Sequence, residues 1–429
     1  MLKKIMFAAL AVVIIGIVAA GCGSSSSSSS SSATASGTES EGSSGSESSP
    51  SEESSSSEEA ESAGEAEFNA KSPGGVISSL PKEVQPAYDG FDAGVEESPW
   101  VNFKPKHGPP WTVGYASGYA GNSWRAGTLE GLERAAEKYE KAGLINKLLV
   151  TQANLNDTVQ IEQVHQLIDQ GADVLVTCCA SAALKQAAEY AGQHGVPVVT
   201  YSGYIDSKYS LNQYPNYLKI GFDMANFIAQ QMGGEGNLLY VNGIPGAASN
   251  TSVDKGVEQA LEQYPDVKVV GTVSGEWTDQ IAKTKVLQFL ATHPEEINGV
   301  VVQPAEEVGT MQAFLQSGRP LPPMTQGGEK GTACYWREHP DWKTRVFNLW
   351  PPGEEGEGAM DTVIKVLQGQ GPKIESITKI APSSGLEEVE KELEPKCDEG
   401  DTTWFEPGNF WSEEYLDNFF EHPKPVLGG

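Results

Sequence analysis

The stretch Gln170-Gly171-Ala172-Asp173-Val174-Leu175-Val176-Thr177 ends in an unbroken apolar run, and Gly195-Val196-Pro197-Val198-Val199-Thr200 has the same form. Between them, the residues from Ser181 onward predict a helix that ends at the glycine of the second stretch. Strands that are continuously apolar, rather than alternating, are typical of a parallel sheet with helices on both faces. The two stretches therefore predict an α/β fold.

The same alternation of strands and helices extends in both directions from these stretches. Helices are predicted at 125–142, from 157 to 171, from 223, and at 252–263, 278–293, 306–316 and 354–367. Further strands are predicted at 112–116, 147–151, 237–241, 267–273, 299–302, 323–326, 344–350 and 374–380. The pattern stops and restarts near residue 223, so it predicts two doubly wound, Rossmann-like lobes rather than one large sheet.

Several short segments in this order resemble one known family. They are Gly114–Arg125, Gln170–Val176, Gly195–Thr200, Gly243-Ile244-Pro245-Gly246 and Thr272–Trp277. Over about residues 111–380 the chain resembles the periplasmic-binding-protein type I fold, and within it the ribose-binding-like substrate-binding proteins of ABC transporters. The resemblance implies two lobes joined by three hinge strands. It also implies a ligand between the lobes and a closed form that a permease recognises.

The N-terminus has the features of a bacterial lipoprotein signal. Lys3 and Lys4 precede fifteen mostly apolar residues, which are short for a membrane span of about 20 residues. Ala19-Ala20-Gly21-Cys22 then resembles a lipobox, so we expect Cys22 to be lipidated and to anchor the protein to the outer face of the cytoplasmic membrane. An uncleaved anchor is the alternative. Residues 23–67 are rich in Ser and Glu and predict a disordered stalk.

The sequence pattern and the resemblance together divide the chain into further parts. We expect an N-terminal extension at 68–110 and a C-terminal extension at 401–429, both packed on the surface of the lobes. The predicted N-lobe comprises 111–222 and 351–378, and the predicted C-lobe comprises 223–350 and 379–400.

The net charge is −29, and residues 68–429 alone carry −21 of it. A chain this acidic is a poor binder of nucleic acid, because affinity for the phosphate backbone comes from Lys and Arg. It is equally unsuited to binding an anionic membrane through a basic surface. We therefore expect no nucleic-acid partner and a membrane contact only through the lipid.

The resemblance also implies which residues hold the ligand. The corresponding positions here are Asn122, Trp124, Arg125, Cys178, Ser202, Asn250, Trp277, Glu329 and Trp350. An Arg that clamps sugars in relatives falls near Val253 and is absent, and Ala305 replaces a common Asn. We therefore expect a sugar-like solute with fewer hydroxyl groups, bound between tryptophan walls with Arg125 and Glu329 as charged groups.

The remaining cysteines suggest an oxidising compartment. Cys334 and Cys397 could form a disulfide there, and the resemblance supports this by assigning both to one lobe. Cys178 and Cys179 are interpreted as strand-end residues; a vicinal disulfide is the alternative. We expect no metal site and no cofactor.

The sequence contains none of the short catalytic motifs of zinc proteases, α/β-hydrolases or P-loop enzymes, so we do not expect an enzyme. The leading hypothesis is a monomeric solute receptor that works with an ABC permease and its ATPase subunit. A ligand-sensing subunit for a membrane kinase or chemoreceptor is the alternative, and a hydrolase on the same scaffold is a third.

Overall fold

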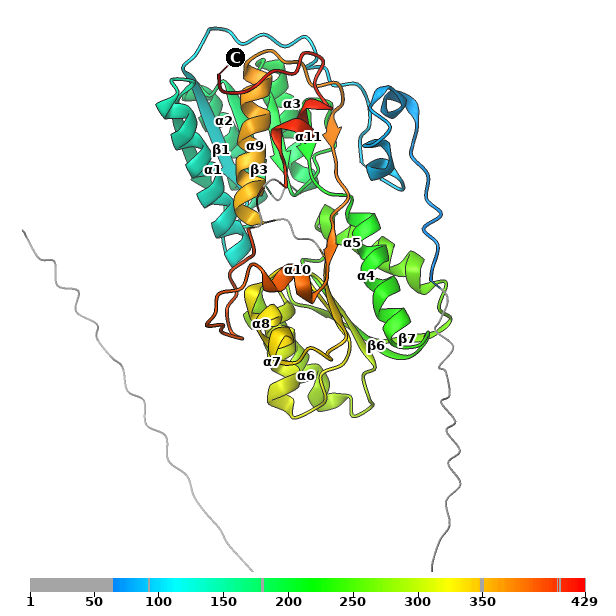
Figure 1. Ribbon diagram of the computed structural model, residues 1–429. Helices are drawn as coiled ribbons and strands as arrows, with labels where there is room; N and C mark the ends of the chain where they lie inside the picture. The colour runs from blue at the N-terminus through cyan, green and yellow to red at the C-terminus, as the bar shows by residue number, and fades with distance from the viewer. Residues whose placement is uncertain are drawn as a thin grey trace, which may run out of the picture. The chain divides into compact units, whose positions relative to one another are not determined.

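The computed structural model describes residues 65–91, 93–178, 181–347, 351–406, 408 and 410–428 (Figure 1). Its first sheet has six parallel strands in the order β11-β5-β4-β3-β1-β2. These strands are β1 (Trp111–Ser117), β2 (Ile145–Gln152), β3 (Val174–Cys178), β4 (Val198–Tyr201), β5 (Ser210–Gln213) and β11 (Ser376–Ile377). The apolar ends of Gln170–Thr177 and Gly195–Thr200 lie in β3 and β4, which are fully buried as their continuous apolar pattern predicts.

A second sheet of six strands has the order β12-β10-β9-β8-β6-β7. Its members are β6 (Glu235–Asn242), β7 (Asp266–Ser274), β8 (Gly299–Val302), β9 (Met324–Gln326), β10 (Thr344–Phe347) and β12 (Ser383–Ser384). Only β12 runs antiparallel to its neighbour. Apart from the short edge strands β11 and β12, the two sheets have the same order, and the predicted pair of α/β lobes is confirmed.

Helices cover the faces of each sheet. The first lobe has α1 (Ser123–Lys141), α2 (Asp157–Asp169), α3 (Lys185–Gln193) and α9 (Pro352–Leu367). The second lobe has α4 (Tyr217–Gln231), α5 (Ala248–Leu261), α6 (Asp279–Thr292), α7 (Glu307–Ser317), α8 (Lys330–Glu338) and α10 (Leu386–Glu390). Helices α1 and α9 lie side by side (Figure 1). Gly131 of α1 lies so close to the Gly353 backbone that a side chain at 131 has no room.

The chain passes between the two sheets at three places within the core fold. It leaves the first sheet after β5 and returns between β10 and α9. It then leaves again between β11 and β12. In an open α/β sheet the strand order reverses at a switch point, here between β1 and β3 and between β6 and β8, and ligands bind beside the carboxyl ends of the strands there.

One predicted boundary is corrected by the structure. The helix expected from residue 223 begins earlier, at Tyr217, because Asn216 caps it by accepting a hydrogen bond from the Lys219 amide at 3.0 Å. The predicted lobe boundary at 222 therefore falls inside α4. Since α4 packs on α5 and β8 of the second sheet, we place the whole helix in the second lobe.

The terminal segments contact both lobes. The N-terminal segment, with the short helices η1 (Gly75–Ser79) and η2 (Gln85–Tyr88), starts on the second lobe, where the Ala66 amide donates to Asn226 Oδ1 at 3.1 Å. It continues onto the first sheet, where the Tyr88 hydroxyl donates to the Ser376 carbonyl at 2.7 Å. The C-terminal segment contains α11 (Glu413–Asp417), which lies on the first lobe. No helix among residues 65–428, as far as they are described, is long and apolar enough to cross a membrane.

Candidate ligand-binding site

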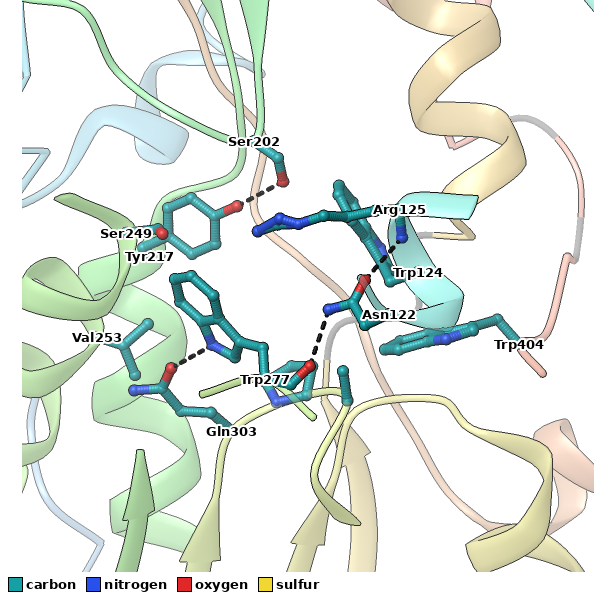
Figure 2. A pocket seen from close by; sticks show the side chains of 12 residues that line it. Asn122, Trp124, Arg125, Ser202, Tyr217, Ser249, Val253, Trp277, Gln303 and Trp404 are labelled. Carbon is teal, nitrogen blue, oxygen red and sulfur yellow. Dashed lines mark hydrogen bonds between the residues drawn. The ribbon is translucent and has the colours of Figure 1, made fainter. Parts of the chain in front are cut away.

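A cavity lies where the two lobes meet, beside the carboxyl ends of their strands (Figure 2). First-lobe residues line one side of it, second-lobe residues line the other, and one residue comes from the C-terminal segment. The lining residues are Asn122, Trp124, Arg125, Ser202, Tyr217, Ser249, Val253, Trp277, Gln303, Pro304, Ala305 and Trp404. The cavity therefore lies where the strand order predicts a binding site.

The start of α1 supplies the first wall. Asn122 caps this helix, because its Oδ1 accepts a hydrogen bond from the Arg125 amide at 2.9 Å. The Asn122 Nδ2 donates to the Trp277 carbonyl of the second lobe at 2.8 Å (Figure 2). The Arg125 guanidinium is buried between aromatic rings, 5.1 Å from the centre of Tyr119 and 5.8 Å from that of Trp277. The start of α1 therefore supplies the Arg125 cation to the cavity and the Asn122 side chain that contacts the second lobe.

Trp277 is fixed from three directions. Its indole Nε1 donates to Gln303 Oε1 at 2.9 Å, and its backbone amide donates to the buried Glu306 carboxyl group. The ring also lies against Gly243, where an added Cβ would come within 2.1 Å of it. The glycine at position 243 therefore leaves the space that the indole occupies.

Three lining residues have left-handed backbone conformations that side chains disfavour. The φ angles are +47° at Ser202, +51° at Trp277 and +69° at Ala305. Such conformations cost on the order of 1–3 kcal/mol each and occur preferentially at functional sites. Ser202 is also held by Tyr217, whose hydroxyl lies 2.8 Å from its Oγ. The backbone of the cavity wall is therefore strained at three residues, and the contact with Tyr217 holds one of them, Ser202, in place.

Burial changes the ionisation of several groups at the cavity. It lowers the pKa of Arg125, and nearby Tyr115 and Tyr201 partly offset this effect. Burial also raises the pKa of Tyr217, and it raises that of Glu306 well above the ordinary value, with Asp279 and Glu307 adding to the effect. Among the described lining residues, Arg125 carries the one formal charge, and the remainder are neutral.

Much of the hydrogen-bonding capacity of the wall is used within the protein. The Asn122 amide is bonded at both ends, and the Ser202 and Tyr217 hydroxyl groups contact each other. Gln303 accepts from Trp277 and donates to the Tyr240 hydroxyl and to Asn250 Oδ1, at 2.8 and 2.9 Å. The surface offered to a solute therefore consists largely of rings and the guanidinium group of Arg125.

The structure brings five of the predicted ligand residues together at this cavity: Asn122, Trp124, Arg125, Ser202 and Trp277. Asn250 lies behind the wall, where its Oδ1 accepts from the Gly243 amide at 2.9 Å. Cys178 is buried at the end of β3 and does not line the cavity. Trp350, like Cys179 and residues 1–64 with Cys22, lies outside the described residues.

Glu329 also lies away from the cavity, in a buried acidic group with Asp279 and Glu307. Glu307 Oε1 accepts hydrogen bonds from the Gly327 and Glu329 amides at 2.8 and 3.1 Å. Burial, together with the neighbouring carboxyl groups, raises the pKa of Glu329 well above its usual value. Glu329 is therefore a buried group away from the cavity, and it does not contact the site as we expected.

Sequence reasoning missed five lining residues: Tyr217, Ser249, Gln303, Pro304 and Trp404. Gln303 directly follows β8, and the end of a strand is a signal that could have found it. Trp404 belongs to the C-terminal segment, and its Nε1 donates to Ser123 Oγ at 3.1 Å. Only the tertiary structure reveals this contact.

Two further observations concern the cysteines and metals. Cys334 in α8 and Cys397 are joined by a disulfide with a Cα–Cα distance of 5.5 Å. Within the described part of the chain, no three His, Cys, Asp or Glu residues are arranged to hold a metal ion. The acidic group around Glu329 therefore carries no metal assignment.

The chain is similar in sequence to two curated binding proteins. The xylitol-binding protein of Mycolicibacterium smegmatis is 28% identical over 186 residues, which cover 43% of this chain and 53% of that protein. The ribose import binding protein of Bacillus subtilis is 27% identical over 214 residues, which cover 49% and 68%. The chain thus spans about half the length of the first relative and two thirds of the second.

The fold is also found among solved structures. An ABC transporter solute-binding protein from Thermobispora bispora superimposes with a TM-score of 0.65 at 23% identity, covering 74% of this chain and all of that one. A family model described as the periplasmic binding protein domain matches residues 113–371. The match runs from within β1 to just past α9 and covers more than half of the chain, so the chain belongs to the periplasmic binding protein family.

Proposed function

We propose that this protein is a lipid-anchored, extracytoplasmic receptor that binds a small solute between its lobes and delivers it to an ABC permease. The observation that carries the proposal is the cavity itself, which both lobes line at the carboxyl ends of their strands. Because the two sides of the site belong to different lobes, a bound solute favours the arrangement in which the lobes approach each other. A permease that recognises that arrangement would sense occupancy.

The chemistry of the wall supports a solute with few hydroxyl groups, such as a deoxygenated sugar acid or a flat aromatic acid. A monosaccharide needs a partner for each buried hydroxyl, and a missing partner costs about 1–3 kcal/mol. Here the side-chain amides of Asn122 and Gln303 are already bonded within the protein. The indoles of Trp124, Trp277 and Trp404 favour a flat, weakly polar body, and Arg125 favours an acceptor group such as a carboxylate or carbonyl.

A thermal-shift panel on the full-length protein tests this ligand class. The panel contains ribose, galactose and xylitol on one side, and benzoate, cinnamate and a deoxygenated sugar acid on the other. A solute at one hundred times its Kd stabilises the native state by about 2.7 kcal/mol, which raises Tm. We expect stabilisation by the second group, and its loss in Arg125→Gln. Tight binding of ribose or galactose would contradict the ligand class but not the receptor role.

Transport and anchoring are tested separately. Deleting the protein should abolish uptake of a radiolabelled solute that the panel identifies, while unchanged uptake of every bound solute would contradict the importer role. Palmitate labelling that is lost in Cys22→Ser would support lipidation. We further propose the domain limits given above, except that the first lobe ends before α4. We also propose that the protein is a monomer, has no enzymatic activity and uses no cofactor. Light scattering of the purified protein tests the monomer.

A further inference from the structure

We propose that the end of the chain, residues 401–406 and 410–420, is a strap that joins the second lobe to the first across the cavity. We further propose that Trp404, at the crossing, is a specificity-determining residue of the site. The inference deepens the proposed function and rests on it for the role of Trp404 in binding. The strap itself rests on contacts that are independent of any ligand.

The second lobe holds the beginning of the strap. The Lys330 and Gly331 amides at the start of α8 donate to the Thr403 and Asp401 carbonyls, both at 2.8 Å. The Phe405 amide donates to the Gly328 carbonyl at 3.2 Å. Just before the strap, the disulfide from Cys397 to Cys334 joins the chain covalently to α8. The strap is therefore fixed to the second lobe before it reaches the cavity.

The first lobe holds the remainder of the strap. Glu354, near the start of α9, accepts hydrogen bonds from the Gly408 and Phe410 amides. Glu406 accepts from the Gly353 amide at 3.1 Å, and its other oxygen contacts Arg134 at 3.4 Å. Because these contacts begin only two residues after Trp404, the chain crosses from the second lobe to the first at Trp404 and Phe405.

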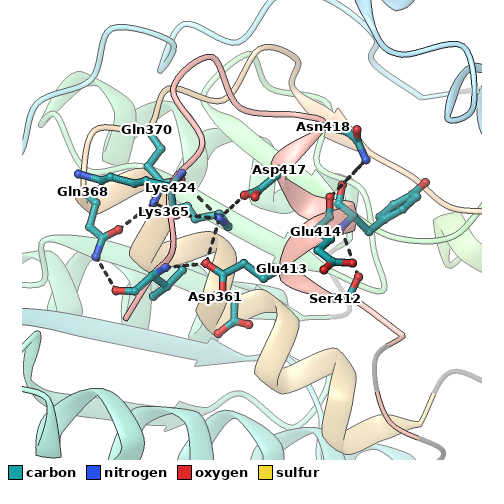
Figure 3. A network of polar contacts seen from close by, with 12 residues as sticks. Asp361, Lys365, Gln368, Gln370, Ser412, Glu413, Glu414, Asp417, Asn418 and Lys424 are labelled. Carbon is teal, nitrogen blue, oxygen red and sulfur yellow. Dashed lines mark hydrogen bonds and ion pairs between the residues drawn. The ribbon is translucent and has the colours of Figure 1, made fainter. Parts of the chain in front are cut away.

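A buried lysine of α9 completes the attachment to the first lobe (Figure 3). The Lys365 side chain is fully buried, and its Nζ forms ion pairs with Asp417 and Glu413 of α11. The same Nζ donates to Gln370 Oε1 and to the Lys424 carbonyl, both at 3.4 Å. A buried charge with this many partners is costly to separate from them, so α11 is held firmly on the first lobe.

The crossing is made by two adjacent residues that face different lobes. Phe405 packs into the apolar cluster of the second lobe with Ala333 and Trp336. Trp404 points the other way, toward α1, and its Nε1 donates to Ser123 Oγ at 3.1 Å. Its ring lines the cavity beside Trp124 and Asn122 (Figure 2). Successive residues of an extended segment point to opposite sides, which explains how one segment contacts both lobes.

This placement makes the cavity wall sensitive to the separation of the lobes. If the lobes move apart, Trp404 can keep either its backbone bridge to Glu329 in the second lobe or its hydrogen bond to Ser123 in the first. Its indole therefore leaves the wall unless the lobes are close together. A solute that packs against the ring favours the joined state, and a solute that cannot do so loses this contribution.

Hydrogen exchange of the full-length protein without ligand tests the strap. In Cys397→Ser we expect faster exchange in the strap and also in residues 121–130 at the start of α1, by roughly fivefold or more for the loss of one anchoring contact. Ser123→Ala, which removes the acceptor of the Trp404 indole, should accelerate exchange in the same two places. Trp342→Phe is the matched control, because Trp342 Nε1 donates to the Pro322 carbonyl at 2.9 Å within the second lobe. Exchange that changes only around residues 394–402 would overturn the strap.

Binding measurements with xylitol and cinnamate test the role of Trp404. For whichever probe stabilises the wild type, Trp404→Ala should raise Kd roughly tenfold, and Trp404→Phe should recover most of the loss because it keeps a ring. An unchanged Kd in Trp404→Ala would overturn the specificity role. If cinnamate does not stabilise the wild type, the aromatic-acid ligand is excluded, and if xylitol also fails, the specificity role of Trp404 is overturned. The exchange experiment decides the strap in either case.

Discussion

Asn122 and Trp277 are 155 residues apart and belong to different lobes, yet the Asn122 Nδ2 donates to the Trp277 carbonyl at 2.8 Å. The other end of the same amide accepts from the Arg125 amide and caps α1. One side chain therefore stabilises a helix, orients the residue that carries the cation and links the two sides of the cavity. Substitutions can separate these roles.

Replacing Asn122 by Ala or Ser separates the cap from the link between the lobes. Ser can still accept from the Arg125 amide, but it is too short to reach the Trp277 carbonyl. We expect Asn122→Ala to lower the free energy of unfolding by about 1–2 kcal/mol, and Asn122→Ser to lower it less. Both variants should weaken solute binding to a similar degree. Urea denaturation and calorimetric titration measure the two effects.

Asn156 provides a matched control for these variants. It caps α2 in the same way, accepting from the Val159 amide at 3.1 Å, but it does not line the cavity. Asn156→Ala should therefore cost about 1 kcal/mol of stability and leave binding unchanged. If Asn122→Ser binds as the wild type does, the contact between the lobes has no role in binding.

Gly243→Ala should displace Trp277. The new Cβ would lie 2.1 Å from the indole, which a side chain cannot tolerate. Overpacking of this kind costs about 1–3 kcal/mol, and the ring must leave its position between Gln303 and Arg125. We expect at least tenfold weaker binding of the panel solute that raises Tm most. Gly108→Ala, where a Cβ meets no atom within 4 Å, should bind normally.

The parts of the fold that could be predicted are those with local signals. Continuous apolar runs predicted β3 and β4. Asn122, Trp124 and Arg125, which line the cavity, were expected there from the family resemblance rather than from a local pattern. Strand β5 was missed, because it is polar and still fully buried. Its amides are satisfied by distant residues, such as the Glu375 carbonyl that accepts from Asn212 at 2.7 Å. No local pattern indicates such a partner.

The same reasoning explains the errors at the site. The resemblance implies a charged ligand contact at Glu329, but burial and the neighbouring Glu307 and Asp279, which come from other elements, raise the pKa of this group. Trp404 lies in a segment without helical or strand periodicity, and its place in the wall depends on anchors on both lobes. Properties set by tertiary contacts were therefore the ones that the sequence could not predict.

Lys365→Met should destabilise the protein through the attachment of α11. The substitution keeps the length of the side chain but leaves Asp417 and Glu413 without their cation. Because these carboxylates are 35% and 40% exposed, water solvates them in part, so we expect a loss of about 1–3 kcal/mol rather than the larger cost of a fully buried pair. A double-mutant cycle with Asp417→Asn should give a coupling of about 1–2 kcal/mol.

A surface pair serves as the reference for this cycle. Lys185 and Asp206 are 2.8 Å apart, but their side chains are 47% and 74% exposed. Water screens this pair, so the coupling between Lys185 and Asp206 should be close to zero. If the coupling energy between Lys365 and Asp417 is no larger than that between Lys185 and Asp206, Lys365 does not hold α11 in place.

The acidic group behind the cavity should make stability depend on pH. Burial raises the pKa of Asp279 from 3.8 to about 7, with the Glu307 charge adding to the effect and hydrogen bonds from Glu329 and the Gly309 amide opposing it. The folded protein therefore holds this proton over a pH range in which the unfolded chain has released it. Where the native state binds more protons, the free energy of unfolding falls as pH rises.

We therefore expect Tm to fall as the pH rises from about 5 to about 8. The titration of Asp279 contributes to this fall up to about pH 7. Glu355, whose pKa burial raises to about 8, extends the fall to the upper end of this window.

Asp279→Asn cannot titrate and should flatten the lower part of this profile, so that the variant gains stability relative to the wild type as pH rises to 7. Glu137→Gln is the control, because Lys141 lowers the pKa of Glu137 and its effect lies below this window. A scan of Tm against pH for the three proteins measures these slopes. Parallel profiles for Asp279→Asn and the wild type would mean that Asp279 is already ionised in the folded protein at pH 5.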